Sequence, residues 1–240
     1  MVVDTIRATQ PWAPHAEYTF PRLSLPERPS VAARINRHLC IDFLEADPDT
    51  AGNNLFGLVW GDTATARLPS LYDPTWEVHH PLPEVVDIEL TAEWCGAYCE
   101  GFTRHYVYDL RNGHYLGFDS LFTPAGLSVV NDTLDKLWRS TLNAYVDSLE
   151  TASSGPDLLP EDKEFAQSVA TLYLDCLEER IDRAPYVDDI QPRLTAMRFF
   201  ISRCAGHVNQ NLDELDPLSF ELSYSWLRQY MRPELRSLFP

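Results

Sequence analysis

The sequence predicts an α+β fold in which a twisted antiparallel sheet carries its helices packed on one face. Apolar and polar residues alternate from Val86 to Trp94, as in a strand with one buried and one solvated face. Asn112-Gly113 follows a second strand-like run, and this dipeptide is typical of a β-hairpin turn. Apolar residues then recur at helical spacing from Leu127 to Leu149, which predicts a long amphipathic helix.

The N-terminal stretch contains three expected elements. Residues 1–16 have two prolines and no apolar period, so we expect a loose arm. Tyr18–Leu25 is predicted to be an edge strand, because Pro21 cannot donate a ladder hydrogen bond. Ser30 is a candidate N-cap for a helix that continues to about Leu44.

Two less regular stretches separate this helix from the central strands. Leu55–Trp60 is predicted to be a short apolar strand. Residues 63–83 contain four prolines and little period, so we expect a long excursion with one short strand or turn. Residues 17–240 are expected to form a single α+β domain, in which residues 17–83 could form an N-terminal subdomain.

The central strands are joined by a compact connection. The second strand is expected at Phe102–Leu110, which is rich in aromatic and β-branched residues. Gly96 and Gly101 bracket the connection between the strands, where an added Cβ is expected to collide with its surroundings. Asn112-Gly113 tolerates a positive φ at both central turn positions and leads into a third strand at Tyr115–Phe118.

After the long helix, the C-terminal part returns to shorter elements. A Ser/Gly linker at 151–157 precedes a second helix that begins at Pro160 and ends near Arg183. The remaining expected elements are two short strands and a final helical turn, at Thr195–Ser202, Phe220–Tyr224 and Trp226–Met231.

Several short signatures together resemble one known family. They are an opening strand and helix, a connection, a turn and a helix entry, at Tyr18–Leu23 with Ala33–Asn36, Cys95–Tyr98, Asp109–His114 and Asp119–Phe122. This pattern resembles the extracellular domain shared by the anti-sigma factor RsiV and the peptidoglycan deacetylase PdaC. In that family the connection reads Gly-Gly-Ala-His, whereas Tyr98 replaces the histidine here. The resemblance implies an antiparallel sheet with helices, and a capacity for protein binding within the family's repertoire.

The charge of the chain favours a basic protein partner. The formal net charge is −17, and residues 147–189 carry twelve acidic residues against three basic ones. Nucleic acids and anionic membranes attract positive charge, so we expect neither a nucleic-acid partner nor a membrane surface. A negative field speeds the approach of a basic protein. Acidity that only maintains solubility is the alternative.

Five cysteines at irregular spacing do not resemble the framework of a secreted disulfide-rich protein. Cys40 and Cys176 lie in helical patterns and are interpreted as small buried apolar residues. Cys95 and Cys99 flank a three-residue loop. Three states stay open for them: two reduced thiols, a disulfide or redox pair, or part of a metal site, although zinc usually needs four ligands.

The sequence contains no familiar catalytic motif. A nucleophile elbow, a phosphate loop, a dinucleotide fingerprint and a zinc-protease helix are all absent. Glu93 and Glu100 bracket the central loop and are the carboxylate pair considered for glycosidase-like chemistry. His79-His80 is interpreted as a surface pair, because neighbouring side chains of an extended chain point in opposite directions. His105 is interpreted as a sheet-face residue.

We therefore expect a non-catalytic protein-binding module, with no catalytic residue, cofactor, metal or membrane insertion. The favoured role is a bacterial cytosolic immunity protein that neutralises a basic toxin, since residues 1–18 lack a secretory signal pattern. The alternatives are an envelope-associated or peptidoglycan-linked sensor, exported if a signal segment was removed, and a hydrolase with an unfamiliar site. The candidate partner-binding residues are Tyr98, Glu93, Glu100, Asp175, Glu178, Glu179, Asp182, Asp188 and Asp189.

Overall fold

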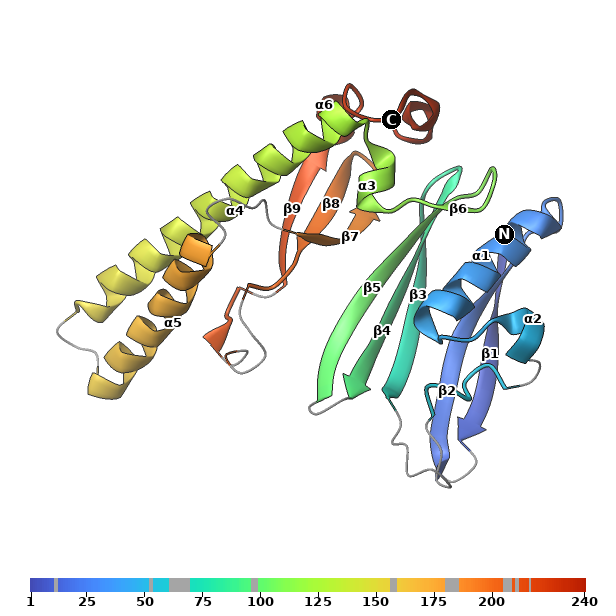
Figure 1. Cartoon of the computed structure of the whole chain (residues 1–240), viewed down its shortest axis with the longest axis horizontal. Coiled ribbons are helices and arrows are strands. Elements are labelled where there is room, and N and C mark those ends of the chain that lie inside the picture. Colours follow the sequence, from blue (N-terminus) through green and yellow to red (C-terminus); the bar gives the residue numbers. More distant parts are fainter. Residues whose placement is uncertain are drawn as a thin grey trace. The chain divides into compact units, whose positions relative to one another are not determined.

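A computed structural model of the chain describes residues 1–240 except 11–12, 52–53, 61–69, 96–98, 156–158, 180–185, 205–208, 210–211 and 216. Its helices and antiparallel strands confirm the predicted α+β class (Figure 1). The strands form three hydrogen-bonded groups, with orders β1-β2, β3-β4-β5-β6 and β7-β8-β9.

The chain divides into two compact units. The first comprises Met1–Gly117 and Gln191–Leu194, and the second comprises Phe118–Ile190 and Thr195–Pro240. The boundary at Gly117 was not predicted from the sequence. The expectation of a single folding domain stays a prediction, because a division by contacts does not measure independent folding.

The elements of the first unit, in chain order, are β1 (Val2–Gln10), β2 (Ala13–Ser24), α1 (Pro29–Phe43), α2 (Pro48–Ala51), β3 (Leu71–Leu82), β4 (Val85–Cys95), β5 (Cys99–Asp109) and β6 (His114–Tyr115).

The N-terminal segment is a strand and not a loose arm. β1 pairs antiparallel with β2, from Val2 opposite Ser24 to Thr9 opposite Glu17. The expectation failed because a paired strand on a polar surface needs no apolar run: most side chains of β1 are exposed or half-buried. Pro21 is accommodated within the ladder, opposite Thr5.

Three local predictions before the central hairpin also differ from the structure. α1 begins at Pro29 after Arg28, which makes no side-chain capping bond, so Ser30 is not the N-cap. Leu55–Trp60 forms turns that bury Phe56 and Val59, and is not a strand. The 71–82 part of the expected excursion is the long strand β3, which accommodates its prolines because the register against β4 shifts twice.

The hydrophobic core of the first unit lies between α1 and the strands. Ile35 and Leu39 of α1 are fully buried and belong to the same cluster as Ile88 and Leu90 of β4. Figure 1 shows α1 lying across one face of these strands, as predicted. The predicted alternation in β4 holds for this core face, although Trp94 at its end is 38% exposed.

A buried carboxylate organises the turn after β5. Asp109 is fully buried and accepts hydrogen bonds from the backbone and the guanidinium of Arg111. Four residues separate Asp109 from its partner His114, so the loop is longer than a two-residue Asn-Gly hairpin. Within this loop, Gly113 has a positive φ of 75° and Asn112 does not. A Cβ added at Gly113 would lie 2.9 Å from the carbonyl oxygen of Val31 in α1. Gly101, in contrast, faces open space, which contradicts the expected collision there. Gly96 lies outside the described residues.

The second unit is built around two long helices. Its elements are α3 (Phe118–Leu121), α4 (Pro124–Ser153), α5 (Pro160–Glu179), β7 (Val187–Pro192), β8 (Ala196–Ile201), β9 (Leu218–Ser223), α6 (Tyr224–Leu227) and the 3-10 helix η2 (Pro233–Leu238), with the last two residues of β7 assigned to the first unit. α4 and α5 lie side by side (Figure 1). Thr123 caps α4 by accepting from the amide of Gly126.

Both long helices were predicted, with different ends. α4 extends beyond the expected Leu149 to Ser153, and α5 is described to Glu179. Their apolar stripes bury Trp138 in α4 and Tyr173 in α5. β8 and β9 confirm the two predicted C-terminal strands, whereas β7 and η2 were missed.

Candidate functional site

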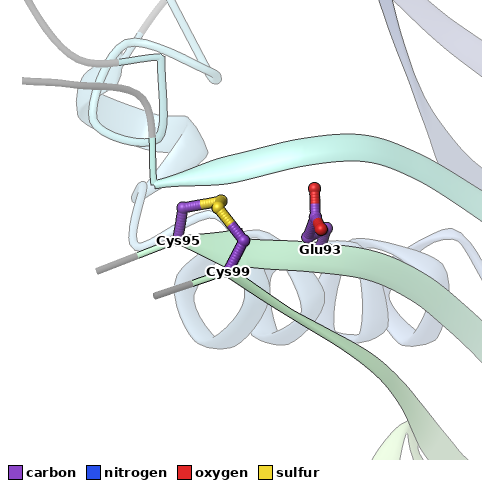
Figure 2. A group of neighbouring side chains, drawn as sticks. All are labelled: Glu93, Cys95 and Cys99. Carbon is purple, nitrogen blue, oxygen red and sulfur yellow. A yellow bond between two sulfur atoms is a disulfide. The ribbon is translucent and has the colours of Figure 1, made fainter. Parts of the chain in front are cut away.

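The tip of the β4–β5 hairpin carries the predicted cysteine pair. Cys95 and Cys99 are direct partners in the ladder, with Cα atoms 4.0 Å apart, and the structure joins them in a disulfide. Glu93 precedes Cys95 by two residues, so its side chain rises from the same face of the strand, as Figure 2 shows. Opposite Glu93 lies Gly101, which adds no side chain to this face. The tip therefore presents an exposed carboxylate beside a disulfide.

The structure does not bring Glu93 and Glu100 together. Glu100 is the ladder partner of Trp94, and successive residues of a strand point to opposite faces. The two carboxylates consequently lie on opposite faces of the hairpin and do not face each other across a cleft. Tyr98 lies outside the described residues.

A second disulfide ties the second unit together. Cys176 of α5 is bonded to Cys204, which follows β8. Cys176 is buried as predicted, but the interpretation of it as an unbonded apolar residue was wrong, because its partner lies 28 residues away in sequence. Cys40 is a free, buried cysteine, and burial raises the pKa of its thiol to about 11. A thiol with such a pKa is a poor nucleophile near neutral pH.

The α4–α5 pair presents a strongly acidic surface. The two helices contain ten acidic and three basic residues. Nine of the acidic side chains are exposed, and none of the nine has an ion-pair partner among the residues that the structure describes. These nine, called the acidic helix surface below, are Asp132, Asp147, Glu150, Glu161, Asp162, Glu164, Asp175, Glu178 and Glu179. Leu174 is 46% exposed beside Asp175.

The predicted acidic candidates near β7 have different environments. Asp188 is exposed and accepts a hydrogen bond from Ser202. Asp189 is 7% exposed, so it does not offer a carboxylate to a partner. Asp182 lies outside the described residues.

A group of charged side chains on the first unit escaped the sequence analysis. On one face of β3, β4 and β5, Glu77 is paired with Glu89 and Glu89 with His105, while His79 is paired with Asp87. His79 Nε2 lies 2.9 Å from Glu89 Oε2. His105 Nδ1 lies 3.1 Å from a carboxylate oxygen of Asp87, and both of these side chains are buried. We call these five residues the charged sheet face.

The sequence contains the two-residue spacing of this face but not the strand pairing that brings its residues together. Glu77 and His79 are two residues apart, as are Asp87 and Glu89, which is the period of a strand face. Residues 63–83 were not recognised as containing a long strand, so no register could place the two pairs side by side. The interpretation of His79-His80 as a surface pair was right for exposed His80 only.

A small hollow in the second unit is lined by apolar, aromatic and charged side chains. It is bordered by Tyr173, Arg203 and Asp213, among others. Tyr173 donates to Asp213 at 2.8 Å, and burial is the main reason why the pKa of Tyr173 is raised. Arg203 approaches the same carboxylate at 3.5 Å. Each charged or polar group named here has a partner, which is the pattern of a structural network.

Two groups among the described residues have donor atoms close enough to hold a metal ion: Glu93, Cys95 and Cys99 at the hairpin tip, and Glu77, His79 and Glu89 on the charged sheet face. No helix in the described part of the chain is both long and apolar enough to span a membrane.

Comparisons with known proteins find similarity to solved structures. No family model matches the sequence, and no curated protein matches it. The fold is similar to the crystal structure of a DUF3298 family protein from Pseudomonas aeruginosa PAO1, with a TM-score of 0.49 and 14% sequence identity. The match covers 100% of this chain and 96% of that one. The chain is not assigned to a family on this likeness.

Proposed function

We propose that this protein is a non-catalytic protein-binding module that recognises a basic protein through the acidic helix surface. The more specific role is that of a bacterial immunity protein, which neutralises a basic toxin domain by stoichiometric binding. The observation that carries the proposal is the nine exposed carboxylates on α4 and α5, none of which has an ion-pair partner among the described residues.

Repulsion between like charges on this surface destabilises α5, and a basic partner would reduce that repulsion. Asp175 lies three residues before Glu178 and four residues before Glu179, so its carboxylate is a neighbour of both on the exposed side of α5. Like charges at these spacings destabilise a helix by roughly 0.2–0.5 kcal/mol per pair. A basic partner would neutralise this repulsion, and exposed Leu174 would add an apolar contact.

Electrostatic steering gives the proposal a measurable signature. Opposite charges raise the association rate most at low ionic strength, since the Debye length falls from about 10 Å at 0.1 M salt to about 3 Å at 1 M. Binding should therefore form faster and more tightly at low salt. In the proposed mechanism the acidic helix surface attracts the toxin, and the bound module then blocks the toxin's active site.

The test is capture and identification of a partner with matched charge variants. The double variant Asp175→Lys/Glu178→Lys reverses two charges of the acidic helix surface. Its control, Asp4→Lys/Glu27→Lys, makes the same change in net charge at exposed positions of the first unit. Immobilised wild-type protein and the control should retain one basic protein stoichiometrically from the native host, identified by mass spectrometry, and the α5 variant should lose it.

The captured protein is then expressed in a sensitive host. Growth should stop unless the module is co-expressed, and the α5 variant should fail to protect. Equal capture by both charge variants would remove the acidic helix surface from the mechanism. A captured protein whose expression does not harm the host would remove the immunity role but leave the binding module.

One observation favours a second candidate, an envelope-associated binding module. The two disulfides Cys95–Cys99 and Cys176–Cys204 are typical of oxidising compartments. The resemblance to the RsiV and PdaC extracellular domain is in keeping with that location. Cell fractionation separates the two candidates: the immunity role in the cytosol requires the protein in the cytosolic fraction, whereas the envelope role requires it outside.

A further inference from the structure

We infer that Glu77, His79 and Glu89 form a binding site for a divalent transition metal ion of the zinc type, on the charged sheet face. The site does not rest on the proposed protein partner. One donor atom from each of the three residues lies within 4.8 Å of the other two. All three side chains project from the paired strands β3 and β4, so the backbone ladder holds them in place.

The register of the β3–β4 ladder brings two like charges together. Glu77 and Glu89 are direct cross-strand partners. Two carboxylates facing each other in an antiparallel pair are normally destabilising. His79 lies diagonally between them, with Nε2 2.9 Å from Glu89 and Nδ1 3.7 Å from Glu77. A cation bound between the two carboxylates would convert their repulsion into attraction.

The neighbouring buried pair adds a third carboxylate to this face. Asp87 is fully buried and is the ladder partner of His79. The charged sheet face thus carries three carboxylates, those of Glu77, Asp87 and Glu89. A divalent ion would therefore be attracted more strongly than a monovalent one.

The donor atoms favour zinc over magnesium or calcium. One imidazole nitrogen and two carboxylate oxygens are suited to Zn²⁺, whereas Mg²⁺ and Ca²⁺ prefer oxygen ligands alone. Zinc bonds of about 2.0–2.2 Å in a tetrahedral site place donor atoms roughly 3.4 Å apart. The His79–Glu89 separation of 2.9 Å is close to this. The Glu77 side chain is 71% exposed, so it has room to turn toward an ion at this position. Three protein ligands leave one position for water or a ligand.

The second metal-capable group is less suited in this structure. The sulfur atoms of Cys95 and Cys99 are bonded to each other, and zinc binds thiolates, not a disulfide. Keeping the protein oxidised during the test therefore separates the two groups, because of these two only the charged sheet face then offers its ligand atoms.

The test is calorimetric titration of Zn²⁺ into oxidised protein without reductant or chelator. Wild type should bind one ion per chain, and Mg²⁺ at the same concentrations should not bind. His79→Ala and Glu89→Gln should each lower the Zn²⁺ affinity at least about tenfold. The matched control is His80→Ala, because His80 is exposed and follows His79 on a strand whose side chains alternate. It should keep the affinity within about twofold.

Two results would show that the metal site does not exist as proposed. Absence of a one-to-one Zn²⁺ transition in wild type overturns it, as does an equal loss for His79→Ala and His80→Ala. Glu77→Gln guards against variants that misfold, since Glu77 is largely exposed. It should lower the affinity at unchanged circular dichroism, and unchanged affinity would remove Glu77 from the site.

Discussion

The two disulfides should contribute unequally to stability, and this difference follows from their loop lengths. The perturbations are the double variants Cys176→Ala/Cys204→Ala and Cys95→Ala/Cys99→Ala. The first pair closes a loop across a sequence separation of 28, and the second a loop across a separation of 4. A crosslink stabilises the native state mainly by restricting the unfolded chain, and a longer loop is restricted more.

The chain-entropy relation gives the size of the difference. It yields about 3.6 kcal/mol at 25 °C for the Cys176–Cys204 loop and about 2 kcal/mol for the Cys95–Cys99 loop. Cys176 is 4% exposed, so its removal also takes sulfur out of a packed environment. Cys95 and Cys99 are not buried, so no comparable packing loss is expected there. The first variant should therefore lose at least about 1.5 kcal/mol more than the second.

Urea unfolding, followed by far-ultraviolet circular dichroism under non-reducing conditions, measures both losses. Because the disulfides lie in different units, each variant should shift the transition of its own unit if the units unfold separately. Thiol counting on the denatured wild type should find one free cysteine, Cys40. An equal or larger loss for the Cys95/Cys99 variant would refute the reasoning from loop length. Five free thiols would show that neither bond forms.

Three further predictions concern single positions. Gly113→Ala should destabilise the protein by about 1–3 kcal/mol, because φ is positive and the added Cβ would lie 2.9 Å from the carbonyl oxygen of Val31. The control Gly101→Ala should change the free energy of unfolding in urea by no more than about 0.5 kcal/mol. Equal losses for the two variants would contradict this. Trp138→Ala should lower the free energy of unfolding by about 3–5 kcal/mol and lower Tm markedly, because Trp138 is buried. The control Leu137→Ala, at a position 36% exposed, should lower it by under about 1 kcal/mol. The reverse order would mean that α4 is rotated about its axis. Burial raises the pKa of Cys40 from 9.0 to about 11, so the folded state keeps its proton at a pH where the unfolded state loses it. The contribution of Cys40 to stability should be constant below pH 9 and fall by up to about 3 kcal/mol as pH rises to 11. Cys40→Ala should weaken this decline, and an unchanged slope would assign it to other groups.

Strong periodicity made some elements predictable. The apolar stripe of α4 and the alternation of β4 each reflect a long segment with one buried face, so local pattern and tertiary packing agree. β1 and β3 were missed for the opposite reason. The side chains of β1 are mostly exposed, and β3 contains prolines at shifted register, so neither carries the strand period clearly.

Of the candidate sites, one could be predicted from the sequence and the others depend on contacts between distant segments. The exposed acids of α5 could be identified from the sequence, because charge is a property of composition and the helix period places Asp175 beside Glu178. The charged sheet face could not, because the approach of His79 to Glu89 depends on the pairing of two strands. The pairing of Cys176 with Cys204 likewise depends on where the end of β8 meets α5.

Local features of the chain were enough to predict the α+β class, the two long helices, the central hairpin and the excess of negative charge. These features depend on local period, turn chemistry and composition, which are independent of distant contacts. Three features depend on contacts between distant segments: the boundary at Gly117, the position of Glu93 and Glu100 on opposite faces, and the bonding of the cysteines. Strand register decides which residues face each other, and a shift of one residue would turn every side chain to the other face.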